Sequence, residues 1–248
     1  TLKDIATARL LNQHLLRPLF TAPQEVVSWM GAMQAQDFSM CRWAVGVRMR
    51  KPSEAGVIEA LNKGDIIRSH LNRSTWQLVT KEDYHWMMPL HRERSIRSWC
   101  AFAKQSGNPI SDKMMDNSRE LLTNILGGKK HLTREDIIPF YQEIDIDNAH
   151  TVRHLLAVAE AEGIIHNGCT DGRKITYRLY GKDENKFGCL PKEEALARLA
   201  TKYFQSHTRR FCMVERITGE RMPYRNGTDI LCADRKNDKR YGIFSARE

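Results

Sequence analysis

Two glutamines one residue apart, Gln34 and Gln36, have the residue type and spacing that best suit a reaction site in this chain. They follow an apolar segment, and we expect a helix from Pro23 to about Gln34 to carry them. A glutamine side chain donates and accepts hydrogen bonds at once, so the pair can orient a water, a phosphate oxygen or a base edge. The alternative is a polar helix end that faces solvent, because polar side chains are mostly exposed.

The elements around the two glutamines follow one plan that occurs twice. Helices are expected at about residues 4–16, 23–34, 40–47 and 54–62, followed by short strands at 66–71 and 75–79. After a long helix and a turn-rich linker (residues 105–112), helices at 114–126, 133–143 and 150–162 precede a hairpin with strands at 163–167 and 175–179. Helices followed by a two-stranded ribbon are the winged-helix order.

The fold class predicted from this order is mainly α with small β-hairpin wings (α+β), built from tandem winged-helix (helix-turn-helix) units. The first unit is expected at residues 1–104, with the Gln-x-Gln motif, and the second at 105–181. Residues 182–248 open with a helix at about 192–205, and we expect a shortened or incomplete third unit there.

Net charge favours a polyanionic partner. The chain of 248 residues has a formal charge of +9 and a pI near 9.3. Basic residues exceed acidic ones in residues 1–110 (15 against 9) and 181–248 (15 against 10), but not in 111–180 (9 against 11). Two basic ends around a neutral middle suit a protein that grips double-stranded DNA at more than one place. Ordinary solubility charge is the alternative.

Several other classes are disfavoured by the sequence. No apolar run approaches the roughly 18 residues that a membrane span needs. The six cysteines show no C-x-x-C spacing, which argues against zinc and fits a reducing cytosol. There is no Gly-rich phosphate loop and no H-E-x-x-H motif. We therefore expect a cytoplasmic, nucleoid-associated monomer without metal, cofactor or membrane contact.

The chain resembles the tandem winged-helix DNA glycosylases of the azinomycin-resistance type, which act on alkylated bases and interstrand crosslinks. The resemblance lies in Leu16-Arg17-Pro18, Gly31 to Asp37, Trp43 to Arg48, Arg68 to Leu71, Ser74-Thr75-Trp76, Arg153 to Leu156, Glu162 to Ile165, Glu194 to Ala197 and Tyr203 to His207. It covers roughly four-fifths of the chain. It implies that Gln34 and Gln36 are catalytic and that three winged helices form a C-shaped, basic channel around duplex DNA.

Two positions depart from that family. Gln77 stands where members often have His, so a side chain near the site differs. Members usually continue after the equivalent of Ser206-His207 into a Trp-rich helix pair, whereas here Thr208-Arg209-Arg210 follows at once. The second departure puts the third unit and its DNA contacts in question.

The chemistry of two amides suits one kind of lesion. An N3- or N7-alkylated purine is already cationic, so its departure needs no protein acid. What remains is to position a water and to stabilise charge on the sugar. A site poor in acids therefore predicts selectivity for labile, cationic lesions, and an open channel suits crosslinks that are hard to flip into a closed pocket.

Other residues have two interpretations each. Asp37 could activate water or support the oxocarbenium ion, but we favour a cap on the next helix. His70 and Arg73 are either DNA or pocket contacts that support the site, or plain wing residues. Trp43 and Trp76 are predicted to be core rather than base-stacking platforms. DNA-contact candidates are Arg68, Asn72, Arg153, Arg173 and Lys174, the last two on the turn of the second wing.

Two competing functions stay open at this level. A non-enzymatic winged-helix DNA-binding protein, such as a transcriptional regulator, needs base-reading side chains on a recognition helix. The likely recognition helix of the second unit offers Asn148, His150, Arg153 and His154, which is a mixed set. A scaffold that uses winged helices for protein contacts is the third alternative. The Gln-x-Gln pair favours the glycosylase, since a regulator has no need for amides there.

Overall fold

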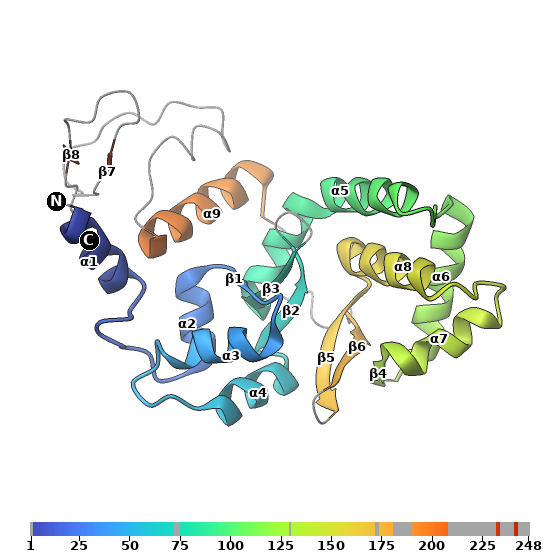
Figure 1. The fold of residues 1–248 in the computed structure, drawn as a ribbon, viewed down its shortest axis with the longest axis horizontal. Coiled ribbons are helices and arrows are strands. Elements are labelled where there is room, and N and C mark those ends of the chain that lie inside the picture. The colour runs from blue at the N-terminus through green and yellow to red at the C-terminus, as the bar shows by residue number, and fades with distance from the viewer. Residues whose placement is uncertain are drawn as a thin grey trace.

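The computed structural model contains two repeats of one element order, which lie side by side and are linked by a long helix (Figure 1). It describes residues 2–71, 75–128, 130–171, 174–180, 190–207, 232–233 and 241–242. Helix with small antiparallel sheets is the predicted fold class, and the structure confirms it.

The first repeat carries the two glutamines. Its elements are α1 (Leu2–Asn12), α2 (Pro23–Met30), β1 (Met33–Gln34), α3 (Phe38–Gly46), α4 (Glu54–Lys63), β2 (Ile66–His70) and β3 (Trp76–Thr80). The three strands form an antiparallel sheet in the order β1-β3-β2. From α2 onward, this is helix, strand, helix, helix and hairpin, the order of a winged helix.

The second repeat follows the connecting helix α5 (Lys81–Gln105), which has Pro89 inside it. Its elements are α6 (Asp112–Ile125), β4 (Leu132–Thr133), α7 (Arg134–Gln142), α8 (Ala149–Glu162), β5 (Ile165–Asp171) and β6 (Lys174–Leu179). The sheet order is β4-β6-β5, so the second repeat has the topology of the first. Then come α9 (Lys192–His207), β7 (Cys232–Ala233) and β8 (Tyr241–Gly242).

Local sequence signals explain where several helices begin and end. Ser53 caps α4 by accepting from the Gly56 amide, and Gly64 ends that helix in the left-handed region at a φ of 80°. The predicted capping box of α7 is present, because the side chains of Thr133 and Asp136 bond each other's backbone amides. These predictions are confirmed.

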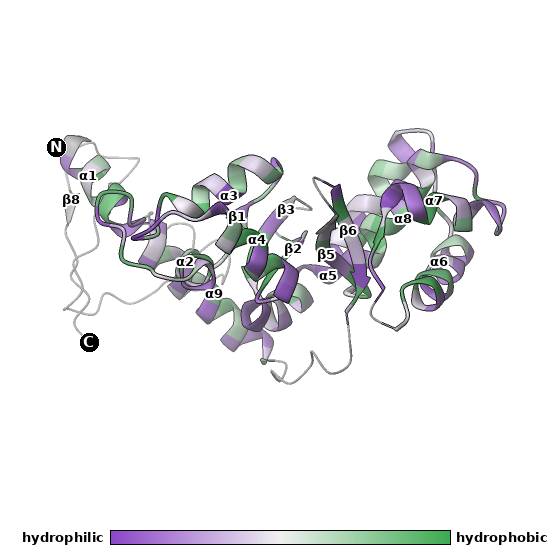
Figure 2. Cartoon of the chain, turned by 90° about the horizontal axis from the view of Figure 1, so that it is seen from below, coloured by the Kyte–Doolittle hydropathy of each residue, from purple (hydrophilic) through white to green (hydrophobic). Residues whose placement is uncertain are grey.

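The cores lie between the sheets and the helices. Helices α2 to α4 pack on one face of the first sheet, around residues such as Val26, Val45 and Leu78. A second core joins α6, α7, α8 and β5. A third lies on the other face of the first sheet and combines Ile67 and Val79 with Tyr84 and Met87 of α5 and Ala195 of α9. Figure 2 shows α6 and α9 with hydrophilic and hydrophobic stripes side by side, as amphipathic helices have.

Two sequence expectations are wrong at this level. Helix α2 ends at Met30 because Gly31 adopts a φ of 76°, so Gln34 lies on a strand and not at a helix end. The predicted first wing is also not a free hairpin. Every residue of β2 is buried, because the strand packs against α5 on one side and against α8 and β5 of the second repeat.

The predicted third unit falls mostly outside the described residues. Within the described part, α9 packs on α1, α2 and α5, and so covers the first repeat. Among those residues, none of the helices has the length and hydrophobicity that a bilayer-crossing segment requires.

Candidate catalytic site and nucleic-acid interface

Gln34 and Gln36 point to the same side of an extended segment. Exposure alternates along it, since Met33 and Ala35 are buried while both glutamines are exposed. Successive side chains of an extended chain point to opposite faces, which explains the pattern. Neither glutamine amide has a hydrogen-bond partner within the described part of the chain. Both are therefore available to a substrate or a water.

The backbone between the glutamines is held by two hydrogen bonds to Ala35. The Ala35 amide donates to the carbonyl oxygen of Trp76 on β3 at 2.8 Å. The Ala35 carbonyl oxygen accepts from Nε of Arg68, on β2, at 3.0 Å. These two bonds fix the peptide groups that join Gln34 to Gln36, so the spacing of the two side chains is set by the neighbouring strands.

Arg68 is a buried cation that links this segment to the second repeat. Its side chain is 5% exposed, and Nη1 donates to Oδ1 of Asn167, on β5, at 2.7 Å. The guanidinium lies over the Trp76 ring, 3.9 Å from the ring centroid. Burial lowers the pKa of Arg68, against the smaller opposing effect of Glu160. The expected DNA contact of Arg68 is corrected, because this side chain holds backbone inside the protein.

His70 is also buried, at 7% exposed. Its Nδ1 pairs with Oε2 of Glu160 on α8, a side chain that is itself fully buried. The imidazole packs on Trp76, with centroids 3.8 Å apart, and meets the Trp99 ring edge-on at 5.1 Å. Asn167 Nδ2 donates to Oε1 of the same carboxylate at 3.4 Å. His70 thus joins the two repeats, and its burial counts against the predicted DNA contact.

Sequence reasoning missed Glu160, the acid at the centre of this cluster. The helix around it is strongly apolar and periodic, and one glutamate within it carried no motif. The signal that could have found it is its position. Glu160 lies among the buried residues of α8, where an unpaired carboxylate would be costly, so a cationic or hydrogen-bonding partner was required.

Asp37 acts as a helix cap. It is the N-cap residue of α3, and its Oδ1 accepts from the Met40 amide at 2.9 Å. The favoured prediction for this residue is confirmed. Its carboxylate is committed to the helix end and stands beside Gln36 without serving as a free base.

Polar atoms behind the glutamines lack partners. In the register of the first sheet, Gln34 lies opposite Gln77, and Gln77 lies opposite Ser69 on the next strand. Such a row of side chains shares one face of the sheet. Among the described residues, Oε1 of Gln77 and Oγ of Ser69 are buried without a hydrogen-bond partner. Gln77, the position where the resemblance leads one to expect His, is therefore an uncommitted polar neighbour of Gln34.

The remaining predicted DNA contacts divide into two groups. Arg153 and Lys174 are exposed, and Lys174 Nζ lies 3.6 Å from a carboxylate oxygen of Glu135. Asn72, Arg73 and Arg173 lie outside the described residues.

The expected recognition helix of the second unit is mostly buried. Thr151 to Ala161 of α8 are buried apart from Arg153, because the helix packs between α5, α6 and the first sheet. His154 is buried beside Ser106, and Asn148 caps the helix. The set Asn148, His150, Arg153 and His154 therefore cannot enter a groove together.

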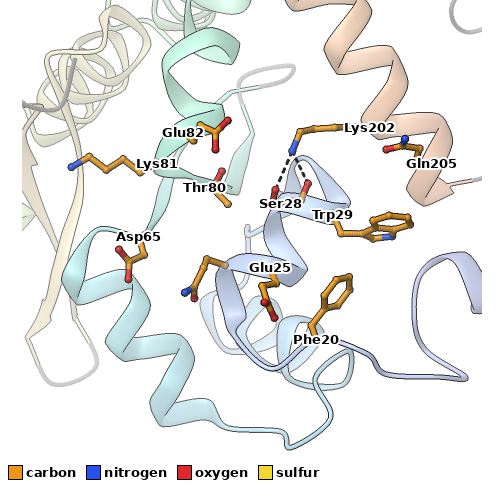
Figure 3. A pocket seen from close by; sticks show the side chains of 11 residues that line it. Phe20, Glu25, Ser28, Trp29, Asp65, Thr80, Lys81, Glu82, Lys202 and Gln205 are labelled. Atoms are coloured by element: carbon orange, nitrogen blue, oxygen red, sulfur yellow. Dashed lines mark hydrogen bonds between the residues drawn. The ribbon is translucent and has the colours of Figure 1, made fainter. Parts of the chain in front are cut away.

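Two pockets occur in the described part of the molecule that are not lined by Gln34 or Gln36. The larger, about 700 Å³, lies between α2, the start of α5 and α9 (Figure 3). Two lysines line it, Lys81 and Lys202, and Lys202 is occupied: Nζ donates to the Ser28 carbonyl at 2.8 Å and to Asp83 at 2.7 Å. Three carboxylates also line it, those of Glu25, Asp65 and Glu82, so it does not suit a phosphate backbone.

The smaller pocket, about 300 Å³, lies where the repeats meet. Arg68 and Trp76 line one side, and residues of α7 and β6, including Lys174 and Tyr177, line the other. Burial, and to a lesser degree Glu160, raises the pKa of Tyr177, so that phenol stays protonated. No group of three or more metal-ligating side chains comes together within the described residues.

The geometry on its own supports binding and orientation by amides. Two free glutamine side chains share one face, an adjacent carboxylate is used as a cap, and the nearest buried acid is paired with His70. Such a site can hold a water or a sugar-phosphate group through hydrogen bonds, and it lacks a free proton donor of low pKa among these residues.

Comparisons with known proteins point to one family. A protein-family model described as DNA glycosylase AlkZ-like matches residues 27–208. Among solved structures, the Streptomyces sahachiroi DNA glycosylase AlkZ is similar, with a TM-score of 0.67 and 18% sequence identity. The match covers 84% of this chain and 57% of that one, so this chain spans little more than half the length of that protein. At this identity the likeness shows the fold alone. A search of the curated proteins found no match.

Proposed function

This chain belongs to the AlkZ-like DNA glycosylase family, and we propose that it hydrolyses the N-glycosidic bond of cationic N3- or N7-alkylated purines in double-stranded DNA, interstrand crosslinks included. The family resemblance predicted from the sequence is confirmed by the match over residues 27–208. One observation carries the proposal: the Gln-x-Gln motif presents two exposed amides, unpaired among the described residues, on a segment that hydrogen bonds from β3 and from Arg68 of β2 hold in place.

Gln34 and Gln36 act on the water and the sugar in this proposal. The bond from C1′ to the purine nitrogen breaks, and its electron pair neutralises the alkylated base as it leaves. One amide oxygen accepts a hydrogen bond from the attacking water, whose oxygen then bonds to C1′ and whose proton passes to solvent. Fixed amide dipoles beside the sugar favour the positive charge that develops there. No protein acid is needed, because the leaving base is already cationic.

The DNA would run across both repeats. We propose the domain division of residues 1–104, 105–181 and 182–248, a C-shaped basic channel, and a cytoplasmic, nucleoid-associated monomer. The net charge of +9 supports a DNA partner, since neutralised phosphates release counterions. Exposed Arg153 and Lys174, together with Asn72, Arg73 and Arg173, are the proposed backbone contacts.

The non-enzymatic regulator finds less support. In a winged helix the third helix of the unit usually enters the groove, and here α8 is mostly buried. The corresponding helix of the first repeat, α4, exposes Glu54 and Glu59, which pair with Arg42 and Lys63. Neither third helix offers the row of base-reading side chains that sequence recognition needs.

The test is base release from defined duplexes. The protein is incubated with duplex containing N7-methylguanine, and with a matched duplex containing the neutral lesion hypoxanthine. We expect release of N7-methylguanine, slower release of hypoxanthine by at least about a hundredfold, in line with the 10²- to 10⁴-fold value of general acid catalysis, and loss of release in Gln34→Ala plus Gln36→Ala.

The matched control is Gln142→Ala, an exposed glutamine at the end of α7 in the other repeat. It should keep the wild-type rate. Tight DNA binding by the wild type without release of either base would exclude the glycosylase, and release that survives the double substitution would exclude the site assignment.

A further inference from the structure

Helix α3 exposes two large apolar side chains. Trp43 is 62% exposed and Met40 is 55% exposed. Residues three apart on a helix are neighbours on its surface, so the two side chains form one patch. The prediction that Trp43 belongs to the core is wrong, because Cys41 and Val45 supply the buried side of α3. Trp76, in contrast, packs against the core of the first repeat, as predicted.

The patch begins next to the two catalytic candidates. Helix α3 starts at Phe38, two residues after Gln36, and Met40 lies in its first turn. With a rise of 1.5 Å per residue, Trp43 lies about 7.5 Å along the helix from Phe38. Successive bases of one DNA strand are 3.4 Å apart, so this is a span of about two base steps.

The charges near the patch suit a nucleic acid. No acidic residue occurs within α3, and the carboxylate of its N-cap residue, Asp37, is bound to the Met40 amide at the helix end. Arg42 lies beside the patch, with its guanidinium 4.5 Å from the Phe38 ring centroid, and pairs with Glu54 at 3.1 Å. That pairing neutralises the nearest carboxylate of α4. An exposed aromatic side chain is a surface on which bases can stack, and both carboxylates closest to it in these contacts, those of Asp37 and Glu54, have partners.

We propose that Trp43 and Met40 form a wedge that stacks on the bases next to the lesion. The inference rests on the proposed function, because Gln36 sets the place of the lesion. Proteins that deform DNA insert apolar side chains between base steps, and base-aromatic stacking tolerates any sequence. The wedge adds a second determinant of substrate preference besides the cationic base. The enzyme prefers duplexes in which base stacking next to that base is already weakened.

The test uses a duplex with 2-aminopurine two steps from N7-methylguanine, since 2-aminopurine fluorescence reports stacking. Binding of the wild-type protein should change the fluorescence, and Trp43→Ala should abolish that change and raise Kd by about ten- to hundredfold. Trp43→Phe should keep most of both, and Met40→Ala should give a smaller loss. The control Phe102→Ala removes an aromatic side chain of α5 that is 48% exposed, and should behave as wild type.

Two outcomes would overturn the wedge, and a third would separate it from the proposed function. Wild-type Kd and fluorescence in Trp43→Ala, with unfolding at the wild-type urea concentration, would overturn the wedge. So would a change of oligomeric state in Trp43→Ala with unchanged DNA binding, which would make the patch a protein contact. The fluorescence readout needs no base release, so a wedge signal without release would reject the proposed function and leave the wedge standing.

Discussion

Replacing Arg68 by methionine should destabilise the protein by about 3–4 kcal/mol. The substitution removes two bonds from a charged donor, to Ala35 and Asn167, each worth about 1.5–3 kcal/mol. It also removes a desolvated contact with the Trp76 ring, worth about 2 kcal/mol. Against these stands the cost of burying the guanidinium, which methionine avoids. The net destabilisation is set near the cost of breaking a buried ion pair, about 3–5 kcal/mol, because the buried acceptors are left unpaired.

Activity should fall as well, for a different reason. Without Arg68 the Ala35 carbonyl loses its partner, and of the two hydrogen bonds to Ala35 only the bond to Trp76 remains. Misplacement of catalytic groups by about 1 Å can cost about 10²-fold. We expect a drop of that size in the single-turnover rate of base release, with little change in Kd, since Arg68 is only 5% exposed.

Stability is measured by urea unfolding, monitored by circular dichroism. Base release is measured without urea, at a temperature at which the variant is folded. Arg68→Lys keeps the charge but not the forked geometry, and should recover part of both losses. Arg97→Met, at an exposed arginine of α5, is the matched control. If Arg68→Met unfolded at the same urea concentration as Arg97→Met, the reasoning about the buried network would be refuted.

Two further predictions concern Asp37 and His91. Asp37→Ala should cost about 1 kcal/mol in urea unfolding through loss of the α3 cap, while base release stays within twofold; a loss as large as that of the glutamine variants would make Asp37 catalytic. Burial, and then Arg94, lowers the pKa of His91, so the folded state keeps it neutral while the unfolded state takes up a proton. The free energy of unfolding should therefore be complete above pH 6.5 and fall as the pH drops below it, and His91→Leu should flatten that decline in urea titrations between pH 5 and 8; an unchanged slope would count against this origin.

Elements with a local cause were predictable from the sequence. Ser53 and Gly64 bound α4, and Gly163 ends α8 with a φ of 75°, as a residue without a side chain allows. These signals act over three or four residues, so no tertiary information is needed to recognise them. The order of helices and hairpins in both repeats followed from them.

Elements whose cause lies far along the chain were not predictable. β1 has two residues and no periodic pattern, and it exists because Gln34 pairs with Gln77 on β3. The burial of Arg68 and His70 depends on Asn167 and Glu160, which come from the other repeat. A charged residue in a strand indicates an exposed site until its partner is known, and the sequence does not reveal the partner. For Trp43 the error was the reverse: aromatic residues usually belong to a core, so burial was predicted, but the side chain is exposed.

The arrangement of acids connects the fold to the proposed chemistry. Glu160 is a buried carboxylate beside β2, and its two oxygens are used by His70 and Asn167 to join the repeats. Asp37, adjacent in sequence to Gln36, is used by the helix that carries the wedge. Both acids therefore serve structure, and the exposed segment keeps amides alone. With these two acids committed to structure, the proposed reaction depends on a base that leaves unaided once water and sugar are held in place.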